Sequence, residues 1–324
     1  MNILVTGGAG YIGSHTAKAL AQAGHVPVVY DNLEKGHRWA VQWGPLVEGD
    51  MADREKLLQT MKEHSIEGAI HFAAYIAVGE SMSQPERYFR NNVCNSLNLL
   101  GAMEQAGVRR IVFSSTAAVY GMPESTPIPE DHRKAPVNAY GEGKWMVEKL
   151  IEWFGQIHGF HSARLRYFNA AGADPDCEIG EDHEPETHLI PLALAAAAGR
   201  IANLQLFGTD YPTKDGTAVR DYIHVTDLAD AHVRALDHIG RTESSVILNL
   251  GTGEGHTVRE VIETASRVTG REVPVLERPR REGDPAALVA DSRAARELLN
   301  WEPSHSGLEE ILETAWRWYR RNEG

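Results

Sequence analysis

Cysteine is scarce in this sequence: the 324 residues include only two, Cys94 and Cys177. These two lie far apart and belong to no group of cysteines and histidines with metal-binding spacing. The sequence therefore predicts neither a disulfide framework nor a metal site. The acidic stretch "EIGEDHEP" also lacks the spacing of a calcium loop. Two free thiols fit the reducing environment of the cytoplasm.

Basic residues are also relatively few: 32 lysines and arginines stand against 45 aspartates and glutamates, so the formal net charge is −13. A nucleic-acid-binding surface needs a basic footprint, so no nucleic acid is expected as a partner. The longest apolar run, "LIPLALAAAAG", is too short to cross a bilayer, and "MNILVTGGAG" has neither the basic region nor the cleavage site of a signal peptide. We therefore expect a cytoplasmic protein with no membrane partner.

Short β-rich runs alternate with helical periodicity in the first half of the chain. Strands are expected at residues 3–6, 26–30, 69–72, 111–114 and 163–168, with helices such as 11–23 and 93–106 between them. This alternation predicts an α/β fold with a Rossmann-type, doubly wound parallel sheet. The regularity weakens after about Gly172. We expect a nucleotide-binding domain over residues 1–172, with contributions from about 220–250, and a smaller, partly interleaved C-terminal substrate-binding domain over 173–324.

The stretch "ILVTGGAGYIG" carries the strongest local signal. Gly7, Gly10 and Gly13 recur every third residue, and the same stretch fits the pattern G-x-G-x-x-G between a predicted strand and a predicted helix. Glycines allow the tight turn and a close approach to a pyrophosphate, which the helix N-terminus attracts. Asp31 ends the next predicted strand, where a carboxylate accepts a hydrogen bond from a ribose 2′-hydroxyl and repels a 2′-phosphate. The pattern predicts NAD as the cofactor; the alternative is a glycine-rich turn in another α/β fold.

A hydroxyl cluster and a Tyr-Lys pair are the candidate catalytic groups. Ser114, Ser115 and Thr116 lie at the C-terminal end of a predicted central strand, where open α/β sheets bind ligands. Tyr140 and Lys144 are four residues apart and share one face of a predicted helix. The ammonium is expected to lower the pKa of the phenol, so that Tyr140 acts as a general base near neutral pH. The alternatives are a turn or helix cap at the hydroxyls and a solvent-facing Tyr-Lys pair.

Two glycines, Gly141 and Gly143, lie between the tyrosine and the lysine. Each glycine inside a helix costs about 1 kcal/mol relative to alanine, so their presence needs a reason. We expect them to let a flat cofactor ring or a sugar approach the helix closely.

These motifs together resemble the extended short-chain dehydrogenases/reductases and, among them, the UDP-glucose 4-epimerase family. The resemblance covers nearly the whole chain in the family's order. Besides the glycine turn it includes "FSSTAAVYG", "HFAA", "LRYFNAAGA", "DYPTKDGTAVRDYIHV", "LNLGTG" and "RREGD". It implies that the first domain holds NAD permanently and that the second holds a UDP-hexose. It also implies that Tyr140 removes the sugar O4 proton, that Lys144 assists it and holds the nicotinamide ribose, and that Thr116 bridges the sugar oxygen and the phenol.

The resemblance implies further site residues. At the cofactor, besides the three glycines, Asp31, Tyr140 and Lys144, it places Tyr11, Ile12, Asn32, Asp50, Met51, Phe72, Ala73, Ala74, Asn91, Ser114, Tyr167 and Phe168. At the nucleotide sugar, besides Thr116, it places Asn169, His188, Leu189, Gln205, Phe207, Arg220, Tyr222, Arg281, Asp284 and Leu288. Guanidinium groups suit a diphosphate, so Arg220 and Arg281 are expected to neutralise it. The plainer alternative is that they form surface ion pairs with the adjacent acids Asp221 and Glu282.

Four positions depart from the family's pattern. Thr116 stands where serine is common, and Ile76 where some members carry lysine. His188 stands where asparagine often contacts the substrate. Leu288 stands at the position whose bulk controls entry of N-acetyl groups, and leucine leaves the acceptance of UDP-N-acetylhexosamines open.

Two other functions remain as alternatives. A nucleotide-sugar 4,6-dehydratase or a decarboxylase uses the same scaffold, but a dehydratase needs an acid and a base beside the strand-end hydroxyl, where this chain has Ala117 and Ala118. A non-catalytic NAD-binding regulator would not need Thr116, Tyr140 and Lys144 together. A homodimer is expected from the resemblance, with residues 93–106 and 144–154 as a plausible interface.

Overall fold

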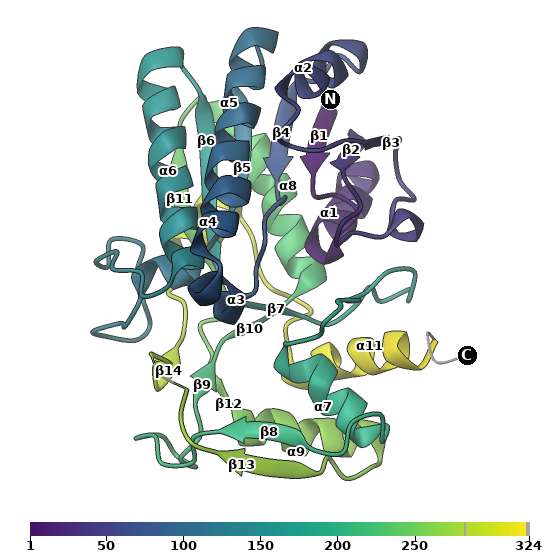
Figure 1. Ribbon diagram of the computed structural model, residues 1–324, viewed down its shortest axis with the longest axis vertical. Coiled ribbons are helices and arrows are strands. Elements are labelled where there is room, and N and C mark those ends of the chain that lie inside the picture. Colours follow the sequence, from purple (N-terminus) through teal and green to yellow (C-terminus); the bar gives the residue numbers. More distant parts are fainter. Residues whose placement is uncertain (282, 322–324) are drawn as a thin grey trace.

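The predicted parallel sheet is confirmed in the computed structural model, which describes residues 1–281 and 283–321. Seven parallel strands run in the order β11-β6-β5-β4-β1-β2-β3 (Figure 1). They are β1 (Asn2–Thr6), β2 (Val26–Asp31), β3 (Leu46–Glu48), β4 (Gly68–His71), β5 (Arg110–Thr116), β6 (His161–Tyr167) and β11 (Val246–Leu250). The chain order reverses beside β1, which is where ligands bind in doubly wound sheets.

Helices cover both faces of this sheet because successive side chains of a buried strand point to opposite faces. In β1, Ile3 and Val5 belong to one core with Leu20 and Leu236, while Leu4 belongs to another. The first core is covered by α1 (Tyr11–Gln22), α8 (Val225–Thr242) and α10 (Arg293–Leu299). The second is covered by α2 (Arg54–Glu63), α5 (Asn95–Ala106) and α6 (Ala139–His158).

The second part of the molecule lies beyond the carboxyl ends of these strands (Figure 1). Its core is formed by α7 (Leu189–Ala197), α9 (Val258–Thr269) and α11 (Leu308–Arg321). Its short strands pair as β8 (Leu204–Phe207) with β13 (Val275–Arg278), and as β12 (His256–Thr257), β9 (Val219–Arg220) and β14 (Ala287–Leu288). Strands β7 (Asn169–Ala171) and β10 (Tyr222–His224) form a third small pair.

Short helical segments follow three strands of the large sheet. After β4 come α3 (Val78–Ser83), α4 (Pro85–Tyr88) and a π-helix (Phe89–Cys94), and after β5 comes a 3₁₀ turn (Ala117–Tyr120). A further 3₁₀ turn (Arg38–Ala40) follows β2. Within the described residues, no helix combines the length and apolar character needed to span a membrane.

The chain passes between its two parts more than once. After residue 172 it returns to the large sheet as α8 and β11, and α10 packs on the same core. Trp301 also belongs to that core, where its indole nitrogen donates to the carbonyl oxygen of Asp227 at 3.0 Å. From the sequence, Trp301 would be grouped with Trp316 and Trp318 in the C-terminal part, and that placement is wrong because the segment after α10 folds back onto α8.

Candidate active site

The turn between β1 and α1 has a geometry that requires glycine at two positions. Gly7 has a φ of 71°, and a Cβ there would lie 2.6 Å from the backbone nitrogen of Ala73. A Cβ on Gly13 would lie 2.2 Å from the carbonyl oxygen of Gly7. The first turn of α1 can therefore pack directly on the loop that follows β1.

The N-terminus of α1 is free to bind an anion. Its N-cap residue, Gly10, contributes no side-chain cap, and its first turn carries no acidic side chain. The nearest atom to a Cβ on Gly10 would be the carbonyl oxygen of Gly7, at 3.4 Å. Because the first N–H groups of a helix lack intrahelical partners, they remain available to a diphosphate. This turn thus fits a dinucleotide.

Asp31 fixes the loop on either side of it. One carboxylate oxygen accepts from the N–H of Ala9 at 3.0 Å, and the other accepts from the N–H of Leu33 at 2.9 Å. Burial raises the pKa of Asp31 above its usual value, although the backbone hydrogen bonds act in the opposite direction. Each carboxylate oxygen has a second lone pair that could still accept a hydrogen bond from a ribose hydroxyl. That contact stays a prediction.

Tyr140, Thr116 and Lys144 are brought together where β5 ends. All three are buried, and the Thr116 hydroxyl lies close enough to the phenol to lower its pKa. Asn138 caps α6 by accepting from the N–H of Gly141 at 2.8 Å, which fixes the start of the helix that carries the pair. The ammonium nitrogen of Lys144 donates to the carbonyl oxygen of Ser114 at 2.9 Å. The solvent-facing alternative for the Tyr-Lys pair is therefore wrong.

The expected electrostatic effect of the lysine is not seen. Burial raises the pKa of Tyr140, and only the Thr116 hydroxyl lowers it. Burial also lowers the pKa of Lys144 to about 7, and its ammonium nitrogen lies 6.0 Å from the centre of the tyrosine ring. Two buried groups without a carboxylate partner each favour the neutral form. In this state Tyr140 is a protonated phenol at neutral pH.

The two helical glycines contact protein. A Cβ on Gly141 would lie 2.7 Å from the carbonyl oxygen of Ala118, in the 3₁₀ turn after β5. A Cβ on Gly143 would make ordinary contacts with Val93 and Phe89, at 3.6 Å and 3.8 Å. The prediction that these glycines admit a cofactor or sugar is wrong: Gly141 instead lets α6 pack against the turn that carries Thr116.

The other residues expected at the cofactor follow the carboxyl ends of the strands. Tyr11 and Ile12 begin α1, Asn32 follows β2, Asp50 and Met51 follow β3, Phe72, Ala73 and Ala74 follow β4, Asn91 lies in the π-helix, Ser114 lies in β5, and Tyr167 and Phe168 lie at the end of β6. Some of these side chains contact protein groups. The Tyr11 hydroxyl donates to the carbonyl oxygen of Gly172 at 2.6 Å, and Ser114 and Tyr167 share a hydrogen bond of 2.7 Å. A diphosphate contact of Tyr11 would therefore come from its backbone.

Several residues expected at the nucleotide sugar also lie together. Leu288 of β14 pairs in register with Arg220 of β9, whose guanidinium donates to a carboxylate oxygen of Asp284 at 2.5 Å. The guanidinium carbon of Arg281 lies 4.0 Å from the centre of the Phe207 ring. Asn169 of β7 and Tyr222 of β10 lie on paired strands, Gln205 lies in β8, and Leu189 begins α7 with His188 as its N-cap.

The ion pair proposed as the alternative for Arg220 is wrong. Asp221 is fully buried, and its carboxylate accepts from the N–H groups of Thr252, Gly253 and Ala290 at 2.9–3.1 Å. The corresponding alternative for Arg281 involves Glu282, which lies outside the described residues. The acid that pairs with Arg220 is instead Asp284, which was itself expected at the nucleotide sugar.

Residues 3–251 match the family described as the NAD dependent epimerase/dehydratase family. This chain belongs to that family.

Similar proteins agree over the full length. The UDP-glucose 4-epimerase of Rhizobium meliloti (strain 1021) is 52% identical over 324 residues, which is all of this chain and 98% of that relative. The crystal structure of UDP-glucose 4-epimerase from Brucella ovis in complex with NAD is 49% identical, with a TM-score of 0.96 over 98% of this chain and 97% of that one. The UDP-glucose-4-epimerase from Stenotrophomonas maltophila, with bound NAD and formylated UDP-arabinopyranose, is 42% identical, with a TM-score of 0.97 over 100% and 99% of the chains.

In this member of the epimerase/dehydratase family, a buried ion pair joins α6, which carries Tyr140, to β6 and β5. The carboxylate of Glu148, on α6, accepts from Arg166 of β6 at 2.9 Å and 2.5 Å and from the Ser115 hydroxyl at 2.6 Å. Arg166 also donates to the Tyr120 hydroxyl at 3.1 Å. No motif in the sequence indicated this network. The spacing of four between Lys144 and Glu148 was the available signal, because it places both on one helix face.

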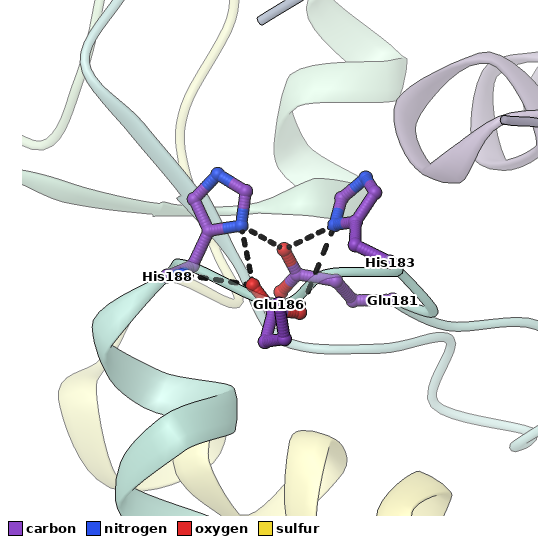
Figure 2. A group of neighbouring side chains, drawn as sticks. All are labelled: Glu181, His183, Glu186 and His188. Carbon is purple, nitrogen blue, oxygen red and sulfur yellow. Dashed lines mark hydrogen bonds and ion pairs between the residues drawn. The ribbon is translucent and has the colours of Figure 1, made fainter. Parts of the chain in front are cut away.

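His188 belongs to a compact group of charged side chains before α7 (Figure 2). Its Nδ1 lies 2.8 Å from Glu181 and 2.9 Å from Glu186, and the Nδ1 of His183 lies 3.1 Å from Glu181. Burial alone would lower the pKa of both histidines, but the hydrogen bonds to these glutamates outweigh it. The pKa rises to about 9 for His183 and to about 10 for His188. Ion pairs between the two protonated histidines and the two glutamates thus explain why these four side chains lie so close together.

These raised pKa values predict a stability that depends on pH. Histidine in an unfolded chain has a pKa of about 6.5, so the stabilisation is complete below that pH and is lost as pH rises through about 9 to 10. We expect the difference in melting temperature between the wild type and the double variant His183→Asn/His188→Asn to shrink from pH 6 to pH 10. Calorimetry across that range measures it. A difference that stays constant would show that the imidazoles are neutral in the folded protein.

Proposed function

We propose that this protein interconverts UDP-glucose and UDP-galactose with tightly bound NAD, by oxidising the sugar at C4 and reducing it again on the other face. The observation that carries the proposal is the burial of Tyr140, Thr116 and Lys144 together at the end of β5, on the same edge of the sheet as a turn that fits a dinucleotide. The names of the similar proteins supply the substrate.

When bound, NAD would supply an oxidised nicotinamide ring able to accept a hydride from the sugar C4 and return it. Tyr140 removes the proton of the sugar O4 hydroxyl and later returns it, which requires the phenol to ionise. Because burial raises the pKa of Tyr140 in this state, positive charge must reach the site before the tyrosine can act as a base. Protonated Lys144 is one source, and its pKa of about 7 makes its charge sensitive to its surroundings.

The second part of the molecule would hold the UDP moiety. Arg220 and Arg281 are the cations that we assign to the diphosphate, in a protein whose formal net charge is −13. Arg220 has a side chain only 12% exposed, so its attraction to a phosphate is weakly screened by solvent. We assign NAD to residues 1–172 with help from about 220–250, and the UDP-hexose to residues 173–324.

The family also includes dehydratases, but the residues beside Thr116 disfavour elimination. Ala117 and Ala118 follow it directly, and methyl groups cannot transfer protons. A decarboxylase or a non-catalytic regulator finds no specific support in the site, whereas the buried tyrosine with its threonine partner suits proton transfer.

The test is turnover of UDP-galactose by the purified protein, followed through UDP-glucose formation in a coupled assay. A sample with bound NAD that leaves UDP-galactose unchanged would rule out the proposal. Release of NAD on heating would only establish the cofactor.

Leu288 is the residue that we expect to control the size of the accepted sugar. It packs against the apolar group around Ala117 and Tyr120, together with Phe168, so it lies close to the end of β5. Leu288→Tyr is expected to lower turnover of UDP-N-acetylgalactosamine by about 10- to 200-fold while keeping that of UDP-galactose within about threefold, since one overlapping group costs about 1–3 kcal/mol. Rates on the two substrates measured side by side test this. Equal losses on both would remove Leu288 from this role.

A homodimer and a cytoplasmic location complete the proposal. α5 and α6 expose Leu97, Trp153 and Ile157, whose exposed fractions are 45%, 59% and 66%. Such apolar side chains favour an interface through these helices. Sedimentation of the wild type and of Trp153→Glu tests it, and a monomeric wild type would contradict it.

A further inference from the structure

The segment after β2, residues 32–37, is bonded directly to the glycine turn that fits the dinucleotide. A Cβ on Gly36 would lie 2.8 Å from the Cβ of Ala9, so the two backbones are in close contact. The N–H of His37 donates to the carbonyl oxygen of Ala9 at 2.9 Å. This segment therefore borders the position where a diphosphate would bind.

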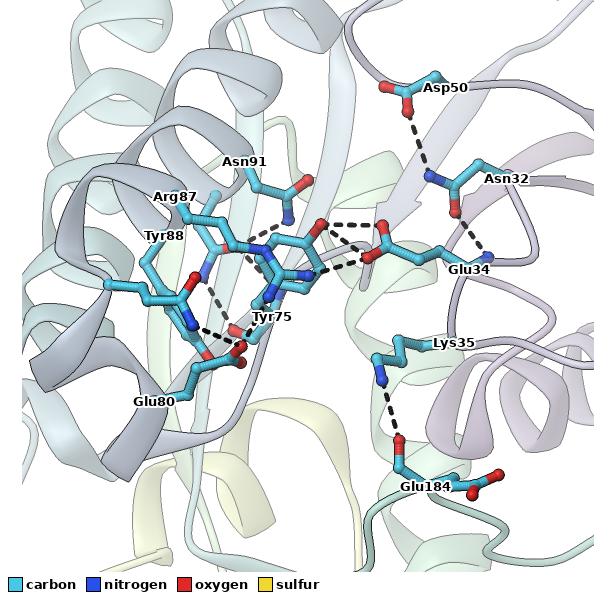
Figure 3. A network of polar contacts seen from close by, with 12 residues as sticks. Asn32, Glu34, Lys35, Asp50, Tyr75, Glu80, Arg87, Tyr88, Asn91 and Glu184 are labelled. Atoms are coloured by element: carbon cyan, nitrogen blue, oxygen red, sulfur yellow. Dashed lines mark hydrogen bonds and ion pairs between the residues drawn. The ribbon is translucent and has the colours of Figure 1, made fainter.

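Glu34 in this segment reaches across to the other side of the turn (Figure 3). Its carboxylate accepts from the Tyr75 hydroxyl at 2.8 Å and 3.0 Å and from the Arg87 guanidinium at 3.0 Å. Glu34 follows β2 and Tyr75 follows β4, and β1 lies between these two strands in the sheet. Two strand spacings are about 10 Å, so the contact bridges the end of β1 where the glycine turn begins.

Tyr75 and Arg87, the two partners of Glu34, are held in place by further contacts. Arg87 donates to Glu80 at 2.6 Å, and its guanidinium carbon lies 4.3 Å from the centre of the Tyr75 ring. Asn92 accepts from the N–H of Tyr75 at 2.8 Å and donates to its carbonyl oxygen at 2.9 Å. Exposed ion pairs contribute little when isolated, but a preorganised network contributes more.

Arg87 moderates the negative charge of the network. Its single positive charge is shared between Glu34 and Glu80, so the three groups together keep one negative charge, and Arg87 lessens the repulsion between Glu34 and a diphosphate. Burial raises the pKa of Tyr75, so its phenol keeps its proton and donates to Glu34 at neutral pH.

We propose that Glu34, Tyr75 and Arg87 form a clasp that closes over the bound dinucleotide and slows its release. Ligands of a doubly wound sheet leave from the carboxyl ends of the strands, so release requires the contact across β1 to open. The clasp affects the dissociation rate more than the chemistry at the sugar, from which it is separate. It rests on NAD as the cofactor and not on the identity of the sugar.

The chain offers a control in α4, next to Arg87. Glu86, adjacent to Arg87, forms an ion pair with Arg90 at 2.9 Å, one helical turn away. The side chains of this pair are 74% exposed for Arg90 and 84% exposed for Glu86. The pair does not cross the glycine turn. Glu86→Ala therefore removes a local ion pair and leaves the clasp intact.

The experiment measures release of labelled NAD from the holoenzyme into excess unlabelled NAD. We expect Glu34→Ala to release NAD about 5- to 30-fold faster than the wild type, Glu86→Ala to match the wild type, and Glu34→Ala/Arg87→Ala to differ little from Glu34→Ala, because both changes break the same contact. The melting temperatures of the NAD-free forms of Glu34→Ala and Glu86→Ala should agree, which separates cofactor retention from general stability.

Two results would overturn the proposal in distinguishable ways. Equal release rates from Glu34→Ala and the wild type would refute the clasp while leaving NAD and the epimerase reaction in place. A wild type that binds no NAD would refute the cofactor and the clasp together, and loss of epimerase activity alone would refute neither.

Discussion

Tyr140→Phe is expected to lower kcat for UDP-galactose by about 10²- to 10⁴-fold, the range typical for loss of a general acid-base group. The variant removes only the hydroxyl, and the ring remains in its buried position, so the fold should be unchanged. The hydroxyl is the atom that interacts with Thr116 and exchanges the sugar proton in our proposal.

The control for this prediction is the NAD content of the variant. It should equal that of the wild type, because the glycine turn and Lys144 are untouched. Steady-state rates and NAD quantification on the same preparation measure both. A variant with wild-type kcat would eliminate proton transfer by Tyr140, whereas loss of NAD together with activity would assign the residue to cofactor binding.

Glu148→Leu is expected to reduce the free energy of unfolding by about 3–5 kcal/mol, because it leaves a buried guanidinium without its counter-charge. Both side chains of the pair are almost fully buried, at 2% exposed for Arg166 and 3% for Glu148. The Ser115 hydroxyl, next to Thr116 in β5, loses its acceptor as well. The same change should therefore lower activity by loosening the contact between α6 and β5.

The matched variant is Glu148→Leu/Arg166→Met, which removes both charges. Replacing a buried pair by apolar side chains is often nearly neutral, so the double variant should recover much of the lost stability. Urea unfolding of the wild type, the single variant and the double variant provides the comparison. A double variant less stable than the single one would mean that Arg166 stabilises the fold through Tyr120 and the Glu130 carbonyl rather than through Glu148.

Much of the fold was predictable because its signals are local. The strand before the glycines, the helix after them and the acid at the end of β2 are all present in the first 31 residues, and they appear as β1, α1 and Asp31 in the structure. Positions of single side chains were less predictable. Glu148 is a charged residue of a helix, and its burial depends on Arg166, which lies on a different element, β6.

The sequence by itself determined the α/β class, the glycine turn that suits NAD, and the placement of Tyr140 and Lys144 on one helix face, since periodicity and turn chemistry act over a few residues. Only the tertiary structure decided the protonation of that pair, the protein contact of Gly141, and the bridge from Glu34 to Tyr75 and Arg87. Burial and charge at a site depend on segments that are distant in the sequence, and a local pattern cannot specify which of them will meet.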